Sequence, residues 1–246
     1  MTVQNSLKEE ESEPARRFLY SEEGCQGKFA IIAVATNPYM QKKFFEMGAD
    51  VVILSKVAPS SQDFMDAFAL ANCKDILVYP NSSNSILASM QAGSMYKGAK
   101  VTVLNCRSIV ECYASLAVMD FDGSVADAVS ISDDIISNIY QVSVHMSVKD
   151  TVYGKTSIRK NEFFALADKD KKIICVSSSV EEAAKNVVEK VLTNGEYCVV
   201  TFYVGKYVSE ELAESLAAYV TDIDSTVEAA IVPTCETTCD LVISFE

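Results

Sequence analysis

Short apolar segments alternate with amphipathic segments from residue 28 onwards, and this alternation constrains the fold more than any other feature. Residues 29–34 read Phe-Ala-Ile-Ile-Ala-Val, which is typical of a parallel strand buried on both faces. Strict strand–helix alternation predicts an α/β fold in which helices cover both faces of a parallel sheet. The predicted strands are 29–34, 51–54, 76–79 and 100–104, and the predicted helices are 39–47, 62–72, 86–95 and 109–119.

The pattern changes after residue 123, where a long helix is predicted over residues 125–140. A hairpin turn is indicated at Tyr153-Gly154. We therefore expect a parallel α/β lobe over residues 28–123 and a mixed-sheet α/β lobe over residues 124–246. The second lobe is predicted to hold strands 142–152, 155–158, 162–167, 172–176, 197–204, 226–232 and 241–245, with helices 180–192 and 210–220.

The first 27 residues show no apolar periodicity, and residues 8–14 read Lys-Glu-Glu-Glu-Ser-Glu-Pro. Such composition favours a solvated segment. We expect residues 1–27 to be an acidic linker or disordered tail. From a linker at this place we expect the chain to continue something that normally precedes it.

The composition excludes several classes of partner. The 246 residues are 49% apolar, enough for a sizeable core, and the formal charge is −13. A nucleic acid or an anionic membrane surface is disfavoured by that charge. The start of the chain lacks the apolar run of a signal peptide, and the apolar stretches are too short to span a bilayer. We expect a cytoplasmic protein with no integral membrane segment.

The cysteines and the single histidine offer little chemistry. Six of the eight cysteines are scattered, mostly in apolar segments, where thiols behave as small hydrophobes. Cys235 and Cys239 form the one close pair, and we read them as ordinary thiols rather than as part of a zinc site, which needs about four ligands. His145 lies in a strand-like alternation, so a structural role is favoured over a general base. We expect no metal and no cofactor.

Two polar loops are the best candidates for a functional site. Residues 55–63 and 81–85 each follow a predicted strand and open a helix, at the sheet edge where α/β proteins bind ligands. Their hydroxyls, amides and helix N–H groups suit a carboxylate or phosphate. They supply no obvious base, nucleophile or metal ligand, so the edge indicates binding rather than catalysis.

Helix capping is the alternative role for these loops. Ser60 and Asp63 have the spacing of a capping box, and Ser83 or Asn84 would cap the next helix. A third loop, Thr36-Asn37-Pro38, is predicted to lie along the same edge, and the convergence of the three loops favours an added binding role. Gly205 lacks the further glycines of a nucleotide-binding loop. The candidate binding residues of the first lobe are Thr36, Asn37, Ser55, Ser60, Ser61, Asn81, Ser82, Ser83 and Asn84.

Several segments match a known family in sequence and in order. They are residues 47–53, 59–63, 79–86, 116–120, 148–154, 200–205, 209–213 and 241–246. Over residues 28–246 the chain resembles the carboxyl-terminal region of fatty acid kinase A-type proteins, which are large bacterial proteins that begin with a dihydroxyacetone-kinase-like ATP domain. That region is similar to the DegV family of fatty-acid-binding proteins.

The resemblance implies a two-lobed DegV-like fold that docks a separate acyl-carrying protein of the DegV type for fatty acid phosphorylation. The kinase portion is absent, so this chain alone is expected to phosphorylate nothing. Asp150, in the matching segment 148–154, joins the candidate residues. Direct fatty acid binding is the alternative, because the serine pairs at 60–61 and 82–83 fall where DegV proteins hold the carboxylate. An unrelated small-molecule enzyme using the same edge ranks last.

The chain departs from the family pattern in its polar loops. The loop at residues 55–60 is shorter, a Pro-Gln-Gly element is replaced by Val110-Glu111-Cys112, and residues 234–240 replace an aromatic segment that contains proline. The core segments are kept. The resemblance therefore predicts the fold more firmly than it predicts any loop contact.

Overall fold

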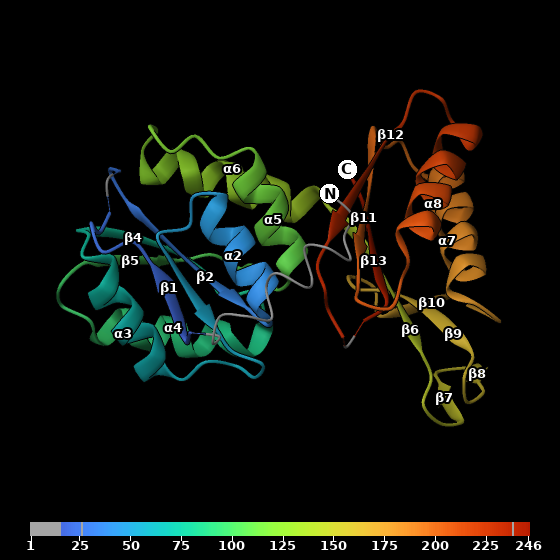
Figure 1. The fold of residues 1–246 in the computed structure, drawn as a ribbon, viewed down its shortest axis with the longest axis horizontal. Coiled ribbons are helices and arrows are strands. Elements are labelled where there is room, and N and C mark those ends of the chain that lie inside the picture. The colour runs from blue at the N-terminus through green and yellow to red at the C-terminus, as the bar shows by residue number, and fades with distance from the viewer. Residues whose placement is uncertain (1–15, 26, 238) are drawn as a thin grey trace. The chain divides into compact units, whose positions relative to one another are not determined.

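The computed structural model describes residues 16–25, 27–237 and 239–246. The chain divides into two compact units, with the boundary between Asn138 and Ile139 (Figure 1). This division falls after helix α6 (Val125–Asn138), whereas the sequence suggested a boundary before it. The helix belongs to the first unit because Ala128 is buried in that unit's core and Ser132 hydrogen-bonds to a strand residue.

The first unit is built on a five-stranded sheet in the order β1-β3-β2-β4-β5. Strands β2, β3, β4 and β5 are parallel, as predicted from the alternation. All six residues of β2 are buried, which accounts for its continuous apolar sequence. The strand bounds are β1 (Phe18–Tyr20), β2 (Ala30–Ala35), β3 (Val51–Leu54), β4 (Asp75–Tyr79) and β5 (Lys100–Val103).

The expectation of a linker or disordered tail is wrong for strand β1. Phe18–Tyr20 pairs antiparallel with β3 and forms one edge of the sheet. The preceding Arg16 carbonyl also accepts a hydrogen bond from Gln41 Nε2 at 3.0 Å. A strand of three residues is too short to show a period of two in the sequence. Residues 1–15 and 26, which the same expectation covered, lie outside the described residues.

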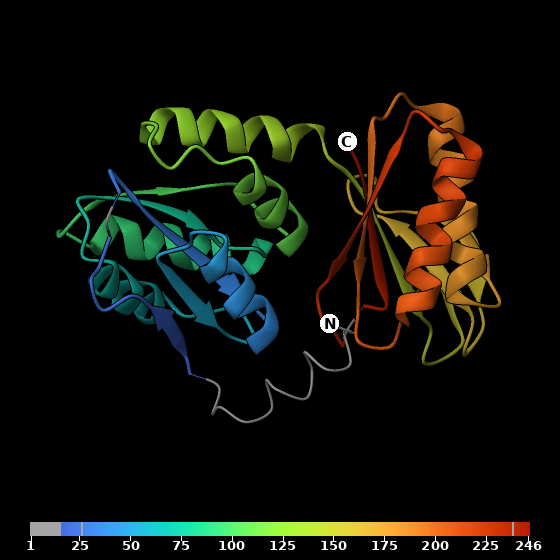
Figure 2. The same cartoon turned by 45° about the horizontal axis from the view of Figure 1, so that its top comes forward.

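Helices cover both faces of the first sheet (Figures 1 and 2). Phe44 of α2 packs on one face together with α5 and α6. Phe64 and Phe68 of α3 pack on the other face together with α4. These rings are fully buried, and burial of a phenylalanine side chain stabilises a fold by about 1.5–3 kcal/mol. The helix bounds are α2 (Pro38–Glu46), α3 (Ser61–Ala71), α4 (Ser83–Met95) and α5 (Ile109–Ala117).

The second unit is built on a six-stranded mixed sheet in the order β10-β9-β6-β13-β11-β12. Only β11 and β12 pair in parallel within this sheet. Helices α7 (Val180–Asn194) and α8 (Glu210–Ile223) pack against the sheet (Figure 2). The strands are β6 (Tyr140–Met146), β9 (Phe163–Ala167), β10 (Lys172–Ser177), β11 (Val199–Val204), β12 (Glu228–Pro233) and β13 (Leu241–Phe245).

The predicted strand over residues 142–152 is two strands in the structure. β6 ends at Met146, and the hairpin of β7 (Thr151–Tyr153) and β8 (Thr156–Ile158) follows a turn. The Ser147 hydroxyl donates to the Lys149 carbonyl at 2.7 Å and holds that turn. The hairpin signal at Tyr153-Gly154 is confirmed, since Gly154 has φ +61° between β7 and β8.

Over the described ranges, the structure has no helix that is both long enough and apolar enough to cross a membrane.

Candidate functional site

The candidate loops of the first unit lie at the carboxyl ends of three adjacent parallel strands. Loop 36–37 follows β2, loop 55–60 follows β3 and loop 80–82 follows β4. The chain leaves β2 towards α2 on one face of the sheet and leaves β4 towards α4 on the other face. A topological switch point therefore lies between β2 and β4, which is the usual ligand position in an open α/β sheet.

Three of the predicted binding residues are helix N-caps. Asn37 Oδ1 accepts the Met40 N–H at 2.9 Å and caps α2. Ser60 Oγ accepts the N–H of the residue three positions on, at 3.2 Å, and caps α3. Ser82 Oγ accepts the Ser85 N–H at 3.2 Å and caps α4. Each cap satisfies an N–H group that the helix itself leaves without a partner.

The capping predictions hold in part. The capping box of Ser60 and Asp63 is confirmed, with bonds in both directions. The prediction that Ser83 or Asn84 caps α4 is wrong, because Ser82 does so with an extended backbone at φ −160° and ψ 149°. In a run of several Ser and Asn residues, each side chain is a suitable N-cap as far as the sequence shows. Only the point at which β4 ends decides which residue is the cap.

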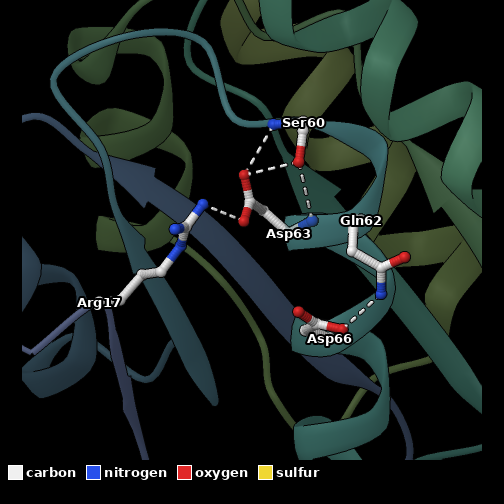
Figure 3. Close-up of polar contacts among 5 residues, drawn as sticks. All are labelled: Arg17, Ser60, Gln62, Asp63 and Asp66. Atoms are coloured by element: carbon white, nitrogen blue, oxygen red, sulfur yellow. Dashed lines mark hydrogen bonds and ion pairs between the residues drawn. The ribbon is translucent and has the colours of Figure 1, made fainter.

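The capping box extends to the N-terminal edge strand through Arg17 (Figure 3). Asp63 Oδ2 accepts both the backbone N–H and the hydroxyl of Ser60 at 2.8 Å, and Asp63 Oδ1 pairs with the Arg17 guanidinium. Burial by itself would raise the pKa of Asp63, but the bonds from Ser60 and the charge of Arg17 outweigh it and lower that pKa. Asp63 is thus a carboxylate that joins three segments of the fold.

Asn81, just after β4, bridges β2 to the loop after β5. Its Nδ2 donates to the Val34 carbonyl of β2 at 2.6 Å, and its Oδ1 accepts from the Cys106 thiol at 3.0 Å. The side chain is buried, with 9% of the residue exposed, and its backbone is left-handed at φ +57°. Asparagine adopts this conformation more readily than most residues. The Asn81 amide thus uses both its nitrogen and its oxygen in hydrogen bonds within the fold at the switch point.

The remaining candidates of the first unit are not helix N-caps. The Ser61 hydroxyl donates to Gln91 Oε1 of α4 at 3.0 Å, and the Ser55 N–H donates to the Ala35 carbonyl at 2.8 Å. Ser83 and Asn84 are exposed in the first turn of α4. Thr36 is half-buried directly after β2.

Asp150 is in the second unit, between β6 and β7. Its Oδ1 accepts the Lys160 N–H at 2.7 Å, which ties that turn to the end of β8. The structure therefore gives Asp150 a local structural contact. Both residues of this contact lie in the second unit.

The second unit holds a Cys–His–Asp grouping that the sequence did not predict. Cys239 Sγ lies 4.0 Å from His145 Nε2, and Asp168 Oδ1 accepts from the Ser143 hydroxyl at 3.3 Å. Burial raises the pKa of Cys239 to about 12, whereas a reactive cysteine requires a lowered pKa. The Cys239 thiol also lies 3.3 Å from the carbonyls of Val144 and Leu241. The grouping suits packing rather than nucleophilic catalysis.

Strand pairing explains why the sequence did not reveal this grouping. His145 on β6 stacks near Phe164 of β9, with ring centroids 5.5 Å apart, and Cys239 is far away in sequence. Within residues 16–25, 27–237 and 239–246, no cluster of three or more His, Cys, Asp or Glu is placed to hold a metal ion.

A cavity of about 510 Å³ lies elsewhere in the second unit, between β10 and the last turns of α7. Its lining includes Tyr140, Lys172, Lys190 and Tyr197. Lys190 Nζ already donates to the Ile174 carbonyl at 2.9 Å. None of these residues is among the candidate binding residues.

Comparison with known proteins identifies the family. Residues 30–246 match the FakA-like C-terminal family, which is described as the C-terminal region of fatty acid kinase A-like proteins. The chain belongs to this family. Protein YloV of Bacillus subtilis is 28% identical over 208 residues, which are 82% of this chain and 36% of YloV. The chain spans about a third of the length of the curated relatives that it matches.

Solved structures show the same fold at low sequence identity. The dihydroxyacetone kinase of C. freundii aligns over 95% of this chain and 51% of its own, with a TM-score of 0.68 and 12% identity. A fatty-acid-binding DegV protein of Thermus thermophilus aligns over 89% of this chain and 99% of its own, with a TM-score of 0.62 and 12% identity. The Fak B3 protein of Streptococcus pneumoniae, loaded with linoleic acid, aligns over 89% of this chain and 99% of its own, with a TM-score of 0.59 and 12% identity. The predicted DegV-like α/β fold is confirmed.

Proposed function

We propose that this domain is a non-catalytic module of a fatty acid kinase A-type protein and that it binds a separate acyl-carrying protein of the DegV type. The observation that carries the proposal is that polar groups at the switch point already bond to other parts of the fold. Asn81 bridges β2 to the loop after β5, and the hydroxyls of Ser60 and Ser82 are used as helix caps. These polar groups hold the fold together, so a bound carboxylate would have to compete with them.

The comparisons support the identity of the partner class. The matching family is named for one component of fatty acid kinase, and Fak B3 of Streptococcus pneumoniae is described as loaded with linoleic acid. A kinase that acts on a protein-bound acyl chain needs a surface for that carrier. We assign this role to the present domain and leave phosphoryl transfer to the part of the relatives that it does not span.

Calorimetry tests the proposal directly. The chain is titrated with a DegV-type protein from its own organism, loaded with a fatty acid, and the same chain is assayed for ATP hydrolysis. We expect saturable binding and no ATP turnover. The carrier without its fatty acid and an unrelated acidic protein of similar size serve as controls. Absence of binding to every DegV-type protein of that organism would refute the proposal.

Direct fatty acid binding is the second candidate, favoured by the helix starts at the same sheet edge. Helices α3 and α4 both begin there, and their first-turn N–H groups have no partner within the helix. Such groups suit a carboxylate, and the hydroxyls of Ser61 and Ser83 lie in the same turns. Native mass spectrometry of the purified chain decides this candidate. A retained acyl chain that is lost in the Ser61→Ala/Ser83→Ala variant supports it, and a mass without ligand excludes it.

A further inference from the structure

One continuous stretch of this acidic chain carries no acidic residue. About one residue in seven is Asp or Glu over the whole chain, yet residues 76–110 contain none. The same stretch contains three basic residues, Lys97, Lys100 and Arg107. It forms most of β4, all of α4, the edge strand β5 and the loops that join them. These elements form one margin of the first sheet, in a chain of formal charge −13. Two acidic residues just outside the stretch adjoin it: Asp75 pairs in register with Lys100, and Glu111 accepts the Arg107 N–H.

Helix α4 also buries small polar side chains while it exposes large apolar ones. Its buried positions include Ser85, at 1% exposed, and Ser89, at 0%. Three of its four large apolar side chains face outwards, with Leu87 74% exposed, Met90 56% and Met95 54%, whereas Ile86 is half-buried. A helix that only covers a sheet normally buries such side chains and exposes charged ones. No residue of Ser83–Met95 is charged.

The exposed apolar side chains share one side of the helix. Leu87 and Met90 are three residues apart, which makes them neighbours on a helix surface. Gln91, one turn after Leu87, accepts the hydrogen bond from Ser61 of α3, so the face borders one of the candidate site residues. Lys97 and Lys100 are exposed just beyond the carboxyl end of α4. We call Leu87, Met90, Met95, Lys97 and Lys100 the α4 surface.

We propose that the α4 surface is where the acyl-carrying partner docks, and that the partner offers an apolar groove bordered by carboxylates. This inference rests on the proposed function. Exposed methionines form adaptable contact surfaces, and leucine and methionine side chains supply apolar anchors for a groove. The acidic remainder of the chain would repel an acidic partner, whereas the α4 surface would attract it. Charge complementarity thus favours this surface over the acidic parts of the chain.

An acidic protein fits this surface better than a membrane does. Helices that lie in a membrane interface combine several basic residues with Trp, Phe or Leu. Helix α4 has no basic residue and no aromatic residue. The overall charge of −13 also opposes approach to anionic lipid.

The apolar part of the surface is tested with Leu87→Ser/Met90→Ser. Both side chains are exposed, so the circular dichroism spectrum and the melting temperature should change little. Binding to the acyl-loaded DegV-type protein should weaken about tenfold or more, as expected when anchors of an interface are removed. The matched control is Val148→Ser/Val152→Ser, which removes two valines that are 76% and 69% exposed in the second unit. Equal affinities of the two variants would overturn the proposal.

The basic part is tested with Lys97→Glu/Lys100→Glu against Lys155→Glu/Lys160→Glu. The first pair should weaken binding and reduce its dependence on salt, and the second pair, exposed in the second unit, should do neither. If the wild-type chain binds no carrier at all, the proposed function fails rather than the choice of surface. Co-sedimentation of the wild-type chain with phosphatidylglycerol vesicles, abolished by Leu87→Ser/Met90→Ser, would replace the protein partner by a membrane.

Discussion

Replacing Asp63 by Asn tests how the N-terminal edge strand is held to the first unit. The carboxylate accepts two hydrogen bonds from Ser60 and pairs with Arg17 (Figure 3). An amide has one acceptor oxygen, so its NH₂ group must face either the Ser60 donors or the guanidinium. Hydrogen bonds to a charged group contribute about 1.5–3 kcal/mol. The Arg17 side chain is 60% exposed, so its ion pair adds only about 0–1 kcal/mol.

We therefore expect Asp63→Asn to lower the free energy of unfolding by about 2 kcal/mol at pH 7. With a urea slope of about 2 kcal/mol per M, the midpoint of the transition that involves α3 should fall by about 1 M. Circular dichroism follows that transition. Trypsin cleavage after Arg17 should also become faster, because β1 loses its ion pair.

Asp66→Asn is the matched control, since Asp66 is exposed on the same helix and accepts one hydrogen bond from Gln62 at 2.7 Å. It should change stability by less than about 0.5 kcal/mol. The pKa of Asp63 is lowered in the fold, so its stabilisation is complete above the ordinary value of 3.8 and is lost as the pH falls through the folded-state value. Equal urea midpoints of the two variants at pH 7 would refute the reasoning.

Four further substitutions test strained or buried positions of the fold. Gly48→Ala should lower the free energy of unfolding by about 2 kcal/mol or more, because φ is +103° and the new Cβ would lie 2.6 Å from an aromatic ring. Gly154→Ala, at φ +61° with open space around it, should lower it by only about 1 kcal/mol. Thermal melts compare the two variants. Burial raises the pKa of Asp50. The contribution of the Asp50 carboxyl to stability therefore declines as the pH rises through that raised pKa. Asp50→Asn should leave the urea midpoint at pH 7 unchanged or higher. Tyr79→Phe removes the 2.7 Å bond to the buried Ser132 hydroxyl and should lower stability by about 1 kcal/mol, a loss that an unshifted melting temperature would contradict.

Local pattern explains why much of the fold follows from the sequence. The apolar run at residues 29–34 and the strands that follow each carry their own evidence, because burial on both faces requires apolar residues at every position. The cap at Ser60 is also local, since the two residues of the box lie three positions apart. Strand β1 carried no such signal, and neither did the break after Met146, because three-residue strands have no measurable period.

The roles of the candidate site residues depended on contacts between distant segments. Asn81 reads as one more polar loop residue, and only the adjacency of β2 and β4 shows that its amide bonds to Val34. Register likewise brings Cys239 towards His145. The orientation of α4 also depends on contacts between distant segments. Its sequence does not say which face is buried, because small, polar and large apolar residues are spread around the whole helix.

The sequence by itself determined the α/β class, the resemblance to the fatty acid kinase A-like domain and the polar edge of the first sheet. Composition and short-range spacing contain this information because strand burial and helix capping are local requirements. The tertiary structure alone decided that Asn81 bridges the switch point, that Arg17 joins the Ser60–Asp63 capping box and that Leu87 and Met90 face outwards. These features depend on which strands become neighbours and how helices rotate against a sheet, and a linear pattern does not encode either directly.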